Sequence, residues 1–389
     1  MLPEPDPFPR LISAQLRALI VAEIQANGPL PFQRFMELAL YAPGLGYYAA
    51  GAQKFGAAGD FVTAPELGNV WAHMLAQTLA ASLRSYANPV LMELGAGSGA
   101  MAVDLLRALA AQDALPVRYL ILERSADLRE RQQQHVRHSL PDLIERVEWL
   151  DQPPKHAFEG AIVGNEVVDA LVCARFVIAE TGVREIAVEL RDGQFAEIDI
   201  APSAKLKSAV RHLESQLETA LQIGYRSELI PELSDWFATI SAPLRRGLIL
   251  LSDYGYGRPE YYLASRHDGT LICHYRHRAH HDPYWYPGLN DISASVDFTA
   301  LAEAAETCGF DLLNYDSQAG YLIAAGIEQC YLHMPALDDR QRLRLSLELQ
   351  QLMLPGQMGE RFKMMLLGRG VDSRSLPIGL QGAGQRRLL

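Results

Sequence analysis

The stretch of sequence that decides the fold is Val90-Leu91-Met92-Glu93-Leu94-Gly95-Ala96-Gly97-Ser98-Gly99. Its first half predicts a short buried strand, and the glycines at alternate positions predict a sharp turn after it. Apolar residues recur at helical spacing in Ala100–Gln112, so a helix is expected behind the turn. Glycine is needed in such a turn because the backbone bends sharply and a ligand must approach the main chain closely. This order of elements is typical of cofactor-binding α/β sheets.

The alternation of strands and helices continues through most of the chain. Further strands are predicted at Val117–Leu122, Arg146–Leu150, Gly160–Val163, Gly247–Ser252 and Asp311–Tyr315, with further helices at Ser125–His138 and Phe298–Cys308. Phe362–Leu367 is expected to add a final antiparallel strand. This order predicts an α/β fold with a doubly wound, Rossmann-like sheet, preceded by a helical segment and interrupted by two large insertions.

Composition and charge restrict the class of protein. The chain has 389 residues, of which 49% are hydrophobic and 21% are charged, which is ample to bury a core. Its net charge of −11 disfavours nucleic acid as a partner and suits a cationic small molecule or a basic protein segment. The four cysteines form no C-x-x-C pattern, Met1–Pro9 lacks the basic region of a signal peptide, and no apolar run is long enough for a membrane span. We therefore expect a cytoplasmic protein without membrane insertion.

Two classes of cofactor are compatible with the glycine turn. With Ala100, the turn satisfies the G-x-G-x-x-[GA] pattern of dinucleotide sites. Glu93 favours S-adenosylmethionine (SAM) instead, because a carboxylate at the strand tip stabilises a cationic amino-acid end and a sulfonium, whereas it repels a pyrophosphate. The residues predicted to bind SAM here are Glu93, Gly95, Gly97 and Gly99.

Glu123 ends the next predicted strand, about 25 residues beyond the glycines. An acid at this place hydrogen-bonds the ribose hydroxyls in either class of cofactor. Glu123 is therefore predicted to bind the adenosine part of the cofactor, without distinguishing the two classes. A helix-capping role beside Ser125 is the alternative.

The loop after the fourth strand of the sheet offers polar groups to an acceptor. It reads Asn165-Glu166-Val167-Val168-Asp169-Ala170-Leu171. Methyl transfer requires an aligned acceptor, and carboxylates suit an amine or a guanidinium because they pair with its N–H groups and accept the released proton. Glu166 and Asp169 are therefore predicted as catalytic residues and Asn165 as a cofactor-binding residue. Capping of the following segment by Asp169 is the alternative.

Several segments, taken in order, resemble one known family. They are Leu38–Tyr48, Gly59–Glu66, Glu93–Gly99, Asn165–Leu171, Ser252–Gly255, Gly269–Leu271, Asp291–Ile292, Val296–Phe298 and Met358–Lys363. Together they resemble the MidA family of class I SAM-dependent methyltransferases, which includes a mitochondrial arginine methyltransferase that assists assembly of respiratory complex I. The resemblance implies that the glycine turn and Glu123 hold SAM. It also implies that Gly59–Glu66 and Asn165–Asp169 line the site, although Val172 stands where the family usually has proline.

Two further segments are predicted to reach the acceptor. Gly59–Glu66 combines glycines, two acids, an aromatic and a hydroxyl, so it predicts a lid that excludes water, and Asp60 is assigned to the acceptor site. Five histidines lie between His267 and His281. Among them His277 is predicted as a substrate contact or proton acceptor, with loop packing as the alternative. Their spacing matches no standard set of ligands, so no metal is predicted.

Four segments are expected along the chain. Residues 1–88 form the N-terminal helices and lid, 89–170 the SAM-binding Rossmann core, 171–246 an insertion that shapes the substrate cleft, and 247–389 the completion of the core. The insertion is expected to open with antiparallel strands at Ala174–Ile178 and Glu185–Glu189 and to continue into the helix Ser203–Ala220. Residues 256–297, rich in His, Tyr, Arg and Pro, are expected to be an irregular loop.

The combined prediction is a SAM-dependent methyltransferase that acts on an arginine guanidinium of a protein substrate. The methyltransferase class follows from Glu93, the glycine turn and the Asn165 loop, whereas arginine and a complex I subunit or its homologue as target follow from the resemblance alone. Two alternatives stay open: a dinucleotide-dependent oxidoreductase on the same fold, and a non-catalytic assembly factor that binds SAM and a partner. A homo-oligomer is compatible with the sequence.

Overall fold

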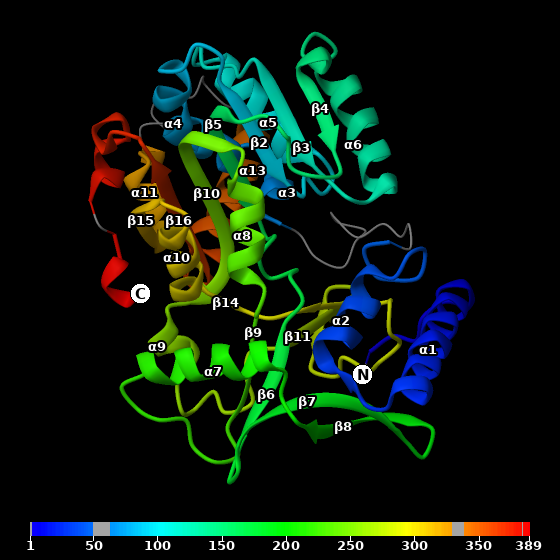
Figure 1. The fold of residues 1–389 in the computed structure, drawn as a ribbon. Coiled ribbons are helices and arrows are strands. Elements are labelled where there is room, and N and C mark those ends of the chain that lie inside the picture. The colour runs from blue at the N-terminus through cyan, green and yellow to red at the C-terminus, as the bar shows by residue number, and fades with distance from the viewer. Residues whose placement is uncertain (1, 50–62, 329–337, 383) are drawn as a thin grey trace. The chain divides into compact units, whose positions relative to one another are not determined.

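The computed structural model describes residues 2–49, 63–328, 338–382 and 384–389, which form two compact units (Figure 1). The insertion unit comprises Met1–Phe61, Val168–Leu233 and Tyr256–Asp297, and the Rossmann unit comprises Val62–Val167, Ser234–Gly255 and Phe298–Leu389. Each unit is therefore assembled from three separate stretches of the chain. The four segments predicted from the sequence were divided by their expected roles, not by compactness, so they do not correspond to these two units. The division by roles stays a prediction.

The Rossmann unit is built on a mixed sheet with the strand order β15-β16-β10-β5-β2-β3-β4. Its strands are β2 (Val90–Leu94), β3 (Arg118–Leu122), β4 (Val147–Leu150), β5 (Phe158–Asn165), β10 (Leu244–Tyr256), β15 (Asp311–Ser317) and β16 (Phe362–Arg369). The pairs from β10 to β4 are parallel, whereas β16 runs antiparallel to both β10 and β15. This topology confirms the predicted α/β fold, including the antiparallel strand near the C-terminus.

Helices cover the sheet of the Rossmann unit and supply most of its core. They are α3 (Ala64–Leu67), α4 (Val70–Arg84), α5 (Ala100–Ala110), α6 (Ala126–Ser139), α8 (Leu233–Ser241), α10 (Phe298–Thr307), α11 (Gln318–Ala324), α13 (Asp339–Met353) and α14 (Met358–Arg361). Apolar side chains of α4 and α5, such as Trp71 and Leu105, join Leu91 and Tyr119 of the strands in one hydrophobic cluster. Every residue of β2 is buried, which fixes the strand before the glycine turn between neighbours on both sides.

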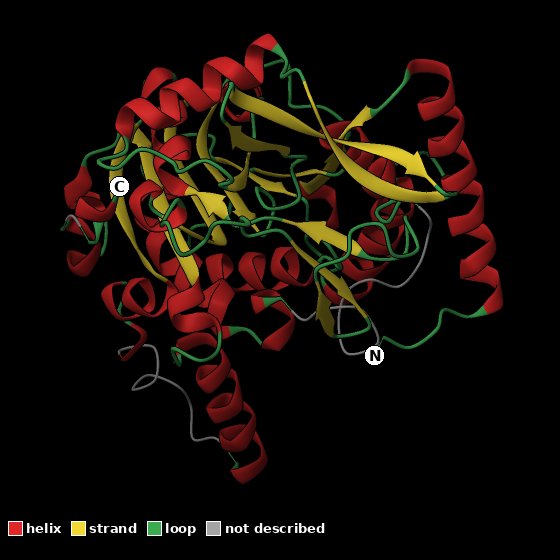
Figure 2. Cartoon of the chain, turned by 90° about the horizontal axis from the view of Figure 1, so that it is seen from below, coloured by secondary structure: helices red, strands yellow, loops and turns green. Residues whose placement is uncertain are grey.

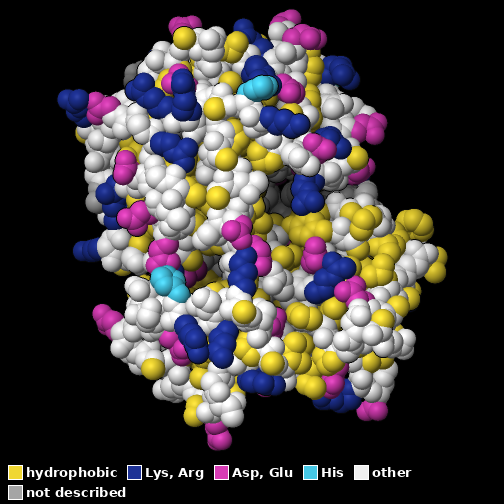
Figure 3. Space-filling model, in the orientation of Figure 1, with side chains coloured by type: hydrophobic (Ala, Val, Ile, Leu, Met, Phe, Trp, Pro, Cys, Tyr) yellow, Lys and Arg dark blue, Asp and Glu magenta, His cyan; other side chains and the backbone are white. Residues whose placement is uncertain are grey.

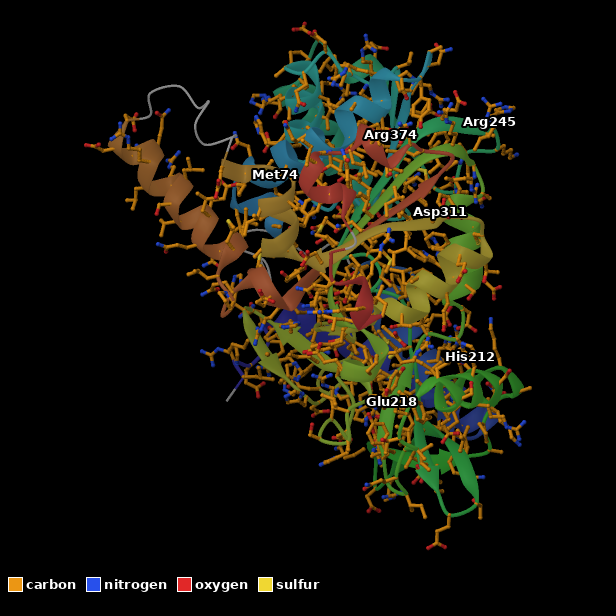
Figure 4. All side chains as sticks on the ribbon, turned by 90° about the vertical axis from the view of Figure 1, so that its left-hand side faces the viewer. Met74, His212, Glu218, Arg245, Asp311 and Arg374 are labelled. Carbon is orange, nitrogen blue, oxygen red and sulfur yellow. The ribbon has the colours of Figure 1, made fainter. Side chains whose placement is uncertain are left out.

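Helix α13 extends away from the rest of the Rossmann unit at its N-terminal end (Figures 2 and 4). Leu343 and Leu347 on this helix are more than half exposed. Further along the same helix, Glu348 is buried and accepts a hydrogen bond from the Val70 backbone N–H at 2.7 Å. This contact joins α13 to the first turn of α4, the helix that carries Met74 in Figure 4.

In its described residues, the insertion unit combines four helices with two small sheets. Its elements are α1 (Pro7–Asn27), β1 (Leu30–Pro31), α2 (Phe32–Tyr41), β6 (Ala174–Ala179), β7 (Gly182–Arg191), β8 (Gln194–Ile200), α7 (Ala204–Gln216), β9 (Arg226–Leu229), α9 (Arg258–Tyr261), β11 (Ile272–Tyr275), β12 (Arg278–His280), β13 (Asp291–Ser293) and β14 (Val296–Asp297). The larger sheet has the order β1-β7-β6-β9, with β8 paired to β7. The predicted antiparallel strands and amphipathic helix of the third segment are thus confirmed.

The expectation of an irregular loop at 256–297 is wrong. This segment contains α9 and the antiparallel sheet β12-β11-β13. Arg276 and His277 form the two-residue turn between β11 and β12, and both have positive φ angles of 47° and 60°. Hairpin turns of this kind favour Asn and Gly, so the sequence carries no ordinary turn signal here. Within β11 the side chains of Cys273 and Tyr275 are buried, and this alternation stabilises the strand.

No helix in the described part of the chain has both the length and the hydropathy to cross a membrane. Acidic and basic side chains are interspersed on the face shown in Figure 3, which therefore carries no continuous patch of either charge.

Candidate cofactor and acceptor site

The glycine turn connects β2 to α5 at the carboxyl end of the sheet. Gly95, Gly97 and Gly99 have φ angles of 60°, 54° and 84°, a left-handed backbone that side chains other than glycine rarely adopt. The backbone N–H of Gly95 donates to the Leu122 carbonyl at 3.0 Å, which joins the turn to the end of β3. The spacing of the three glycines thus follows from backbone conformation, and the turn is held in a fixed position on the sheet.

Glu93 is fully buried near the end of β2. The hydroxyl of Tyr119 donates to its Oε2 at 2.6 Å, and Oε1 has no hydrogen-bond partner among the residues that the structure describes. The pKa of Glu93 is raised to about 7, mainly by burial and further by the charge of Glu123, although the hydrogen bond from Tyr119 lowers it. A cation brought near this carboxyl group would stabilise its ionised form.

Glu123 follows β3 and is also buried. Its Oε1 accepts the Ser125 backbone N–H at 2.9 Å, and its Oε2 accepts the side-chain amide of Gln132 at 3.2 Å. Burial raises the pKa of Glu123, whereas these hydrogen bonds lower it. The bond to Ser125 is part of the local turn before α6, as the capping alternative expects, while the bond to Gln132 links the carboxylate to α6 itself.

Gln132 is a residue of this region that the sequence analysis missed. It is fully buried on α6, where its side-chain amide donates to the Gly97 carbonyl at 3.0 Å as well as to Glu123. Its Oε1 accepts the indole N–H of Trp149 at 3.1 Å. A signal for it exists in the sequence, because Leu128, Gln132 and Val136 are spaced by four residues and form the buried stripe of α6. A polar residue inside such a stripe needs hydrogen-bond partners.

The end of the predicted lid contacts the glycine turn. The Ser98 hydroxyl donates to the carboxylate of Glu66, which lies in the short helix α3. Ser98 also accepts the Ala100 backbone N–H at the start of α5. Asp60, predicted to belong to the acceptor site, lies outside the described residues.

Asn165 ends β5 beside the carboxyl end of β2, and Glu166 follows it directly. The side-chain amide of Asn165 donates to Oε1 of Glu166 at 3.0 Å, and the Glu166 backbone N–H donates to the Ser252 carbonyl at 2.8 Å. Glu166 has a φ of 52°, which is uncommon outside glycine and is found preferentially at functional sites. The buried Oδ1 of Asn165 has no hydrogen-bond partner within the described part of the structure. Two neighbouring parallel strands therefore end in buried acceptor oxygens, on Glu93 and Asn165.

Asp169 and His277 belong to the insertion unit, whereas the residues above belong to the Rossmann unit. Asp169 is mostly buried, and its negative charge contributes to the raised pKa of Tyr48, after burial and the charges of Asp291 and Tyr41. His277 lies at the exposed tip of the β11–β12 hairpin. The catalytic roles predicted for both residues stay predictions.

The histidine-rich segment packs through its aromatic rings. His280 contacts Trp285 with ring centroids 5.6 Å apart, and His281 bonds the Leu271 carbonyl at 3.3 Å. In the described ranges no group of three or more His, Cys, Asp or Glu residues could hold a metal ion.

Comparison with known proteins assigns a class to this arrangement. The model of the Methyltransf_28 family of S-adenosyl-L-methionine-dependent methyltransferases matches residues 70–316. The chain belongs to this family, which confirms SAM as the cofactor and overturns the alternative of a dinucleotide-dependent oxidoreductase. The matched residues include the glycine turn, Glu123 and the Asn165 loop.

Individual relatives cover nearly the whole chain. A crystal structure of a protein from Burkholderia thailandensis bound to S-adenosyl-homocysteine is 40% identical, with a TM-score of 0.89 and 96% of each chain covered. The protein arginine methyltransferase NDUFAF7 homolog, mitochondrial, of Drosophila melanogaster is 27% identical over 92% of this chain and 85% of its own. The human protein arginine methyltransferase NDUFAF7, mitochondrial, is 26% identical over 93% and 85%. These findings confirm the resemblance that the sequence motifs indicated.

The expectation of a cytoplasmic protein is contradicted by these comparisons, because the names of the Drosophila and human relatives describe mitochondrial proteins. The physical reason for the error is that charge, cysteine spacing and hydropathy report a reducing, aqueous environment. Several compartments share that property, so composition could not select one.

Proposed function

We propose that this methyltransferase transfers the methyl group of SAM to a guanidinium nitrogen of arginine in a protein substrate. The arginine is supported by the relatives named protein arginine methyltransferases, and the net charge of −11 suits a cationic acceptor. The observation that carries the proposal is the backbone conformation of Glu166 together with the hydrogen bond that orients its carboxylate. Its backbone is in an unfavourable left-handed conformation at a strand end, and its carboxylate is oriented by Asn165.

The cofactor is assigned to the residues around the glycine turn. Glu123 would hold the ribose hydroxyls, Gly97 allows the ligand to approach the backbone, and Glu93 would stabilise the cationic amino-acid end. The buried oxygens of Glu93 and Asn165 without partners in the described structure fit such a ligand, because an ammonium group supplies N–H donors. When bound there, SAM supplies an electrophilic methyl group.

Glu166 would act on the acceptor. A guanidinium is almost fully protonated at neutral pH, so its nitrogens are poor nucleophiles. A carboxylate paired with two of its N–H groups orients the third nitrogen and draws positive charge away from it. Transfer would break the S–CH₃ bond, leave S-adenosylhomocysteine and form the C–N bond. Glu166 would accept the proton that the nitrogen releases. Asn165 keeps the Glu166 carboxylate in one orientation throughout.

The proposal is tested by supplying the purified protein with labelled SAM and a protein extract, followed by mass spectrometry of the labelled product. We expect label on arginine. Glu166→Gln should keep SAM affinity within about twofold and should lower transfer roughly 10²–10⁴-fold, because it loses the charge that pairs with the guanidinium and accepts its proton. Glu180→Gln, at an exposed position, is the matched control and should transfer at the wild-type rate.

Three outcomes would contradict parts of this proposal. Parallel loss of SAM affinity and transfer in Glu166→Gln would assign Glu166 to the cofactor. Label on a residue other than arginine would overturn the substrate class. SAM binding without any transfer would favour the alternative of a non-catalytic assembly factor.

A further inference from the structure

Gln132 links three parts of the cofactor region through one buried side chain. Its amide nitrogen lies 3.0 Å from the Gly97 carbonyl oxygen and 3.2 Å from Oε2 of Glu123, and its Oε1 lies 3.1 Å from the indole nitrogen of Trp149. The glycine turn, the end of β3 and strand β4 are thereby connected through α6. No other kind of side chain of this size donates two hydrogen bonds and accepts one without carrying charge.

Trp149 decides which way the amide of Gln132 points. An indole N–H can only donate, so it requires the oxygen of the amide on its side. The NH₂ group is then directed to the Gly97 carbonyl and the Glu123 carboxylate, both of which can only accept. A reversed amide would place its oxygen against these two acceptors and its NH₂ group against the indole N–H, so it would lose all three hydrogen bonds.

The hydrogen bonds leave part of Glu123 available. An ionised carboxylate has about four acceptor positions, and Ser125 and Gln132 occupy one on each oxygen. Because Gln132 is neutral, it orients the carboxylate without neutralising its charge, as an arginine or lysine would. The Arg124 backbone N–H is a third donor to this carboxylate and also lowers its pKa. At least one acceptor position therefore remains for a ribose hydroxyl.

We propose that Gln132, oriented by Trp149 and anchored on the Gly97 carbonyl, is a positioning residue that sets the Glu123 carboxylate for the ribose of SAM. The inference rests on the proposed role of Glu123 in ribose binding. Gln132 acts through Glu123 rather than on the reacting atoms. Its effect must therefore depend on the presence of both the ribose hydroxyls and the Glu123 carboxylate.

The test measures binding of S-adenosylhomocysteine and of its analogue without the 2′-hydroxyl by isothermal titration calorimetry. Gln132→Leu should weaken S-adenosylhomocysteine roughly tenfold, since hydrogen bonds to a charged group are lost, and should weaken the deoxy analogue less than about threefold. In a Glu123→Ala background the same substitution should have less than about a twofold effect. Gln134→Leu, at an exposed position of the same helix, is the control and should bind like the wild type.

Trp149→Phe provides a second variant in case Gln132→Leu does not fold. It keeps an aromatic side chain and removes only the donor that orients the amide, so it should show the same dependence on the 2′-hydroxyl with a smaller loss. Equal losses for both ligands, or independent effects of Gln132→Leu and Glu123→Ala, would overturn the proposal and leave Gln132 as a packing residue. If Glu123→Ala binds both ligands like the wild type, the role of Glu123 itself is wrong.

Discussion

Replacing Glu93 with glutamine should stabilise the protein at alkaline pH, because a buried carboxyl group is costly to ionise. The pKa of Glu93 in the folded chain is about 7, against an ordinary value of 4.5. Between these two values the unfolded chain loses a proton that the folded chain keeps. The free energy of unfolding therefore falls as pH rises through this window, by up to about 3 kcal/mol above pH 7, since each unit of difference corresponds to about 1.4 kcal/mol.

The assay is urea unfolding of the wild type and of Glu93→Gln at several pH values from about 4.5 to 8. A glutamine at this position stays neutral and can still accept the hydrogen bond from Tyr119. The difference in free energy of unfolding between the two proteins should thus be small at about pH 4.5 and grow in favour of the variant up to about pH 8. Subtracting one curve from the other removes the titrations that both proteins share.

A control follows from the hydrogen bond at 2.6 Å between Tyr119 and Glu93, which lowers the pKa of the carboxyl group. Tyr119→Phe should raise the folded pKa of Glu93, so the pH-dependent loss of stability should extend to higher pH. Parallel curves for the wild type and Glu93→Gln would refute the reasoning, because Glu93 would then titrate alike in the folded and unfolded chains.

Two further predictions concern the turn and the packing around it. Gly97→Val should abolish SAM binding in calorimetry, because it places a side chain at a φ of 54° in the cofactor turn, whereas Gly193→Val, with a φ of 75° and open space around it, should still bind. Binding of SAM by Gly97→Val would remove the turn from the cofactor site. Glu348→Ala should lower the free energy of unfolding by about 1–2 kcal/mol, since the Val70 N–H at the start of α4 loses its acceptor. Glu348→Gln keeps an acceptor and should lose less than half as much; equal losses would show that packing rather than the hydrogen bond matters.

The structure supports sequence reasoning best where the determinants are local. The left-handed angles of Gly95, Gly97 and Gly99 are properties of single residues, so a glycine at every second position already predicts the turn. The strands of the Rossmann unit were predictable because buried parallel strands are short, apolar and separated by helices. The sheet order then follows from few topological options.

Hairpin and capping features were less accessible to sequence reasoning. Arg276 and His277 both adopt positive φ angles, which are uncommon outside glycine, and the pairing of β11 with β12 and β13 compensates for the local cost. The paired strands are only three or four residues long, so the segment reads as irregular until its neighbours are known. The hydrogen bond of Glu348 was likewise not predictable from the local sequence, because its partner Val70 lies 278 residues away in the chain.

The sequence by itself determined the α/β fold, the cofactor turn and the acidic residues at the ends of three strands, since each depends on a pattern within about ten residues. Only the tertiary structure decided which residues hydrogen-bond these acidic side chains and so fix their orientation. It buried Glu93 against Tyr119, joined Glu123 to Gln132 and Trp149, and set Asn165 on Glu166. Hydrogen-bond partners of this kind come from different strands and helices, and their distances depend on how the whole sheet packs rather than on any one segment.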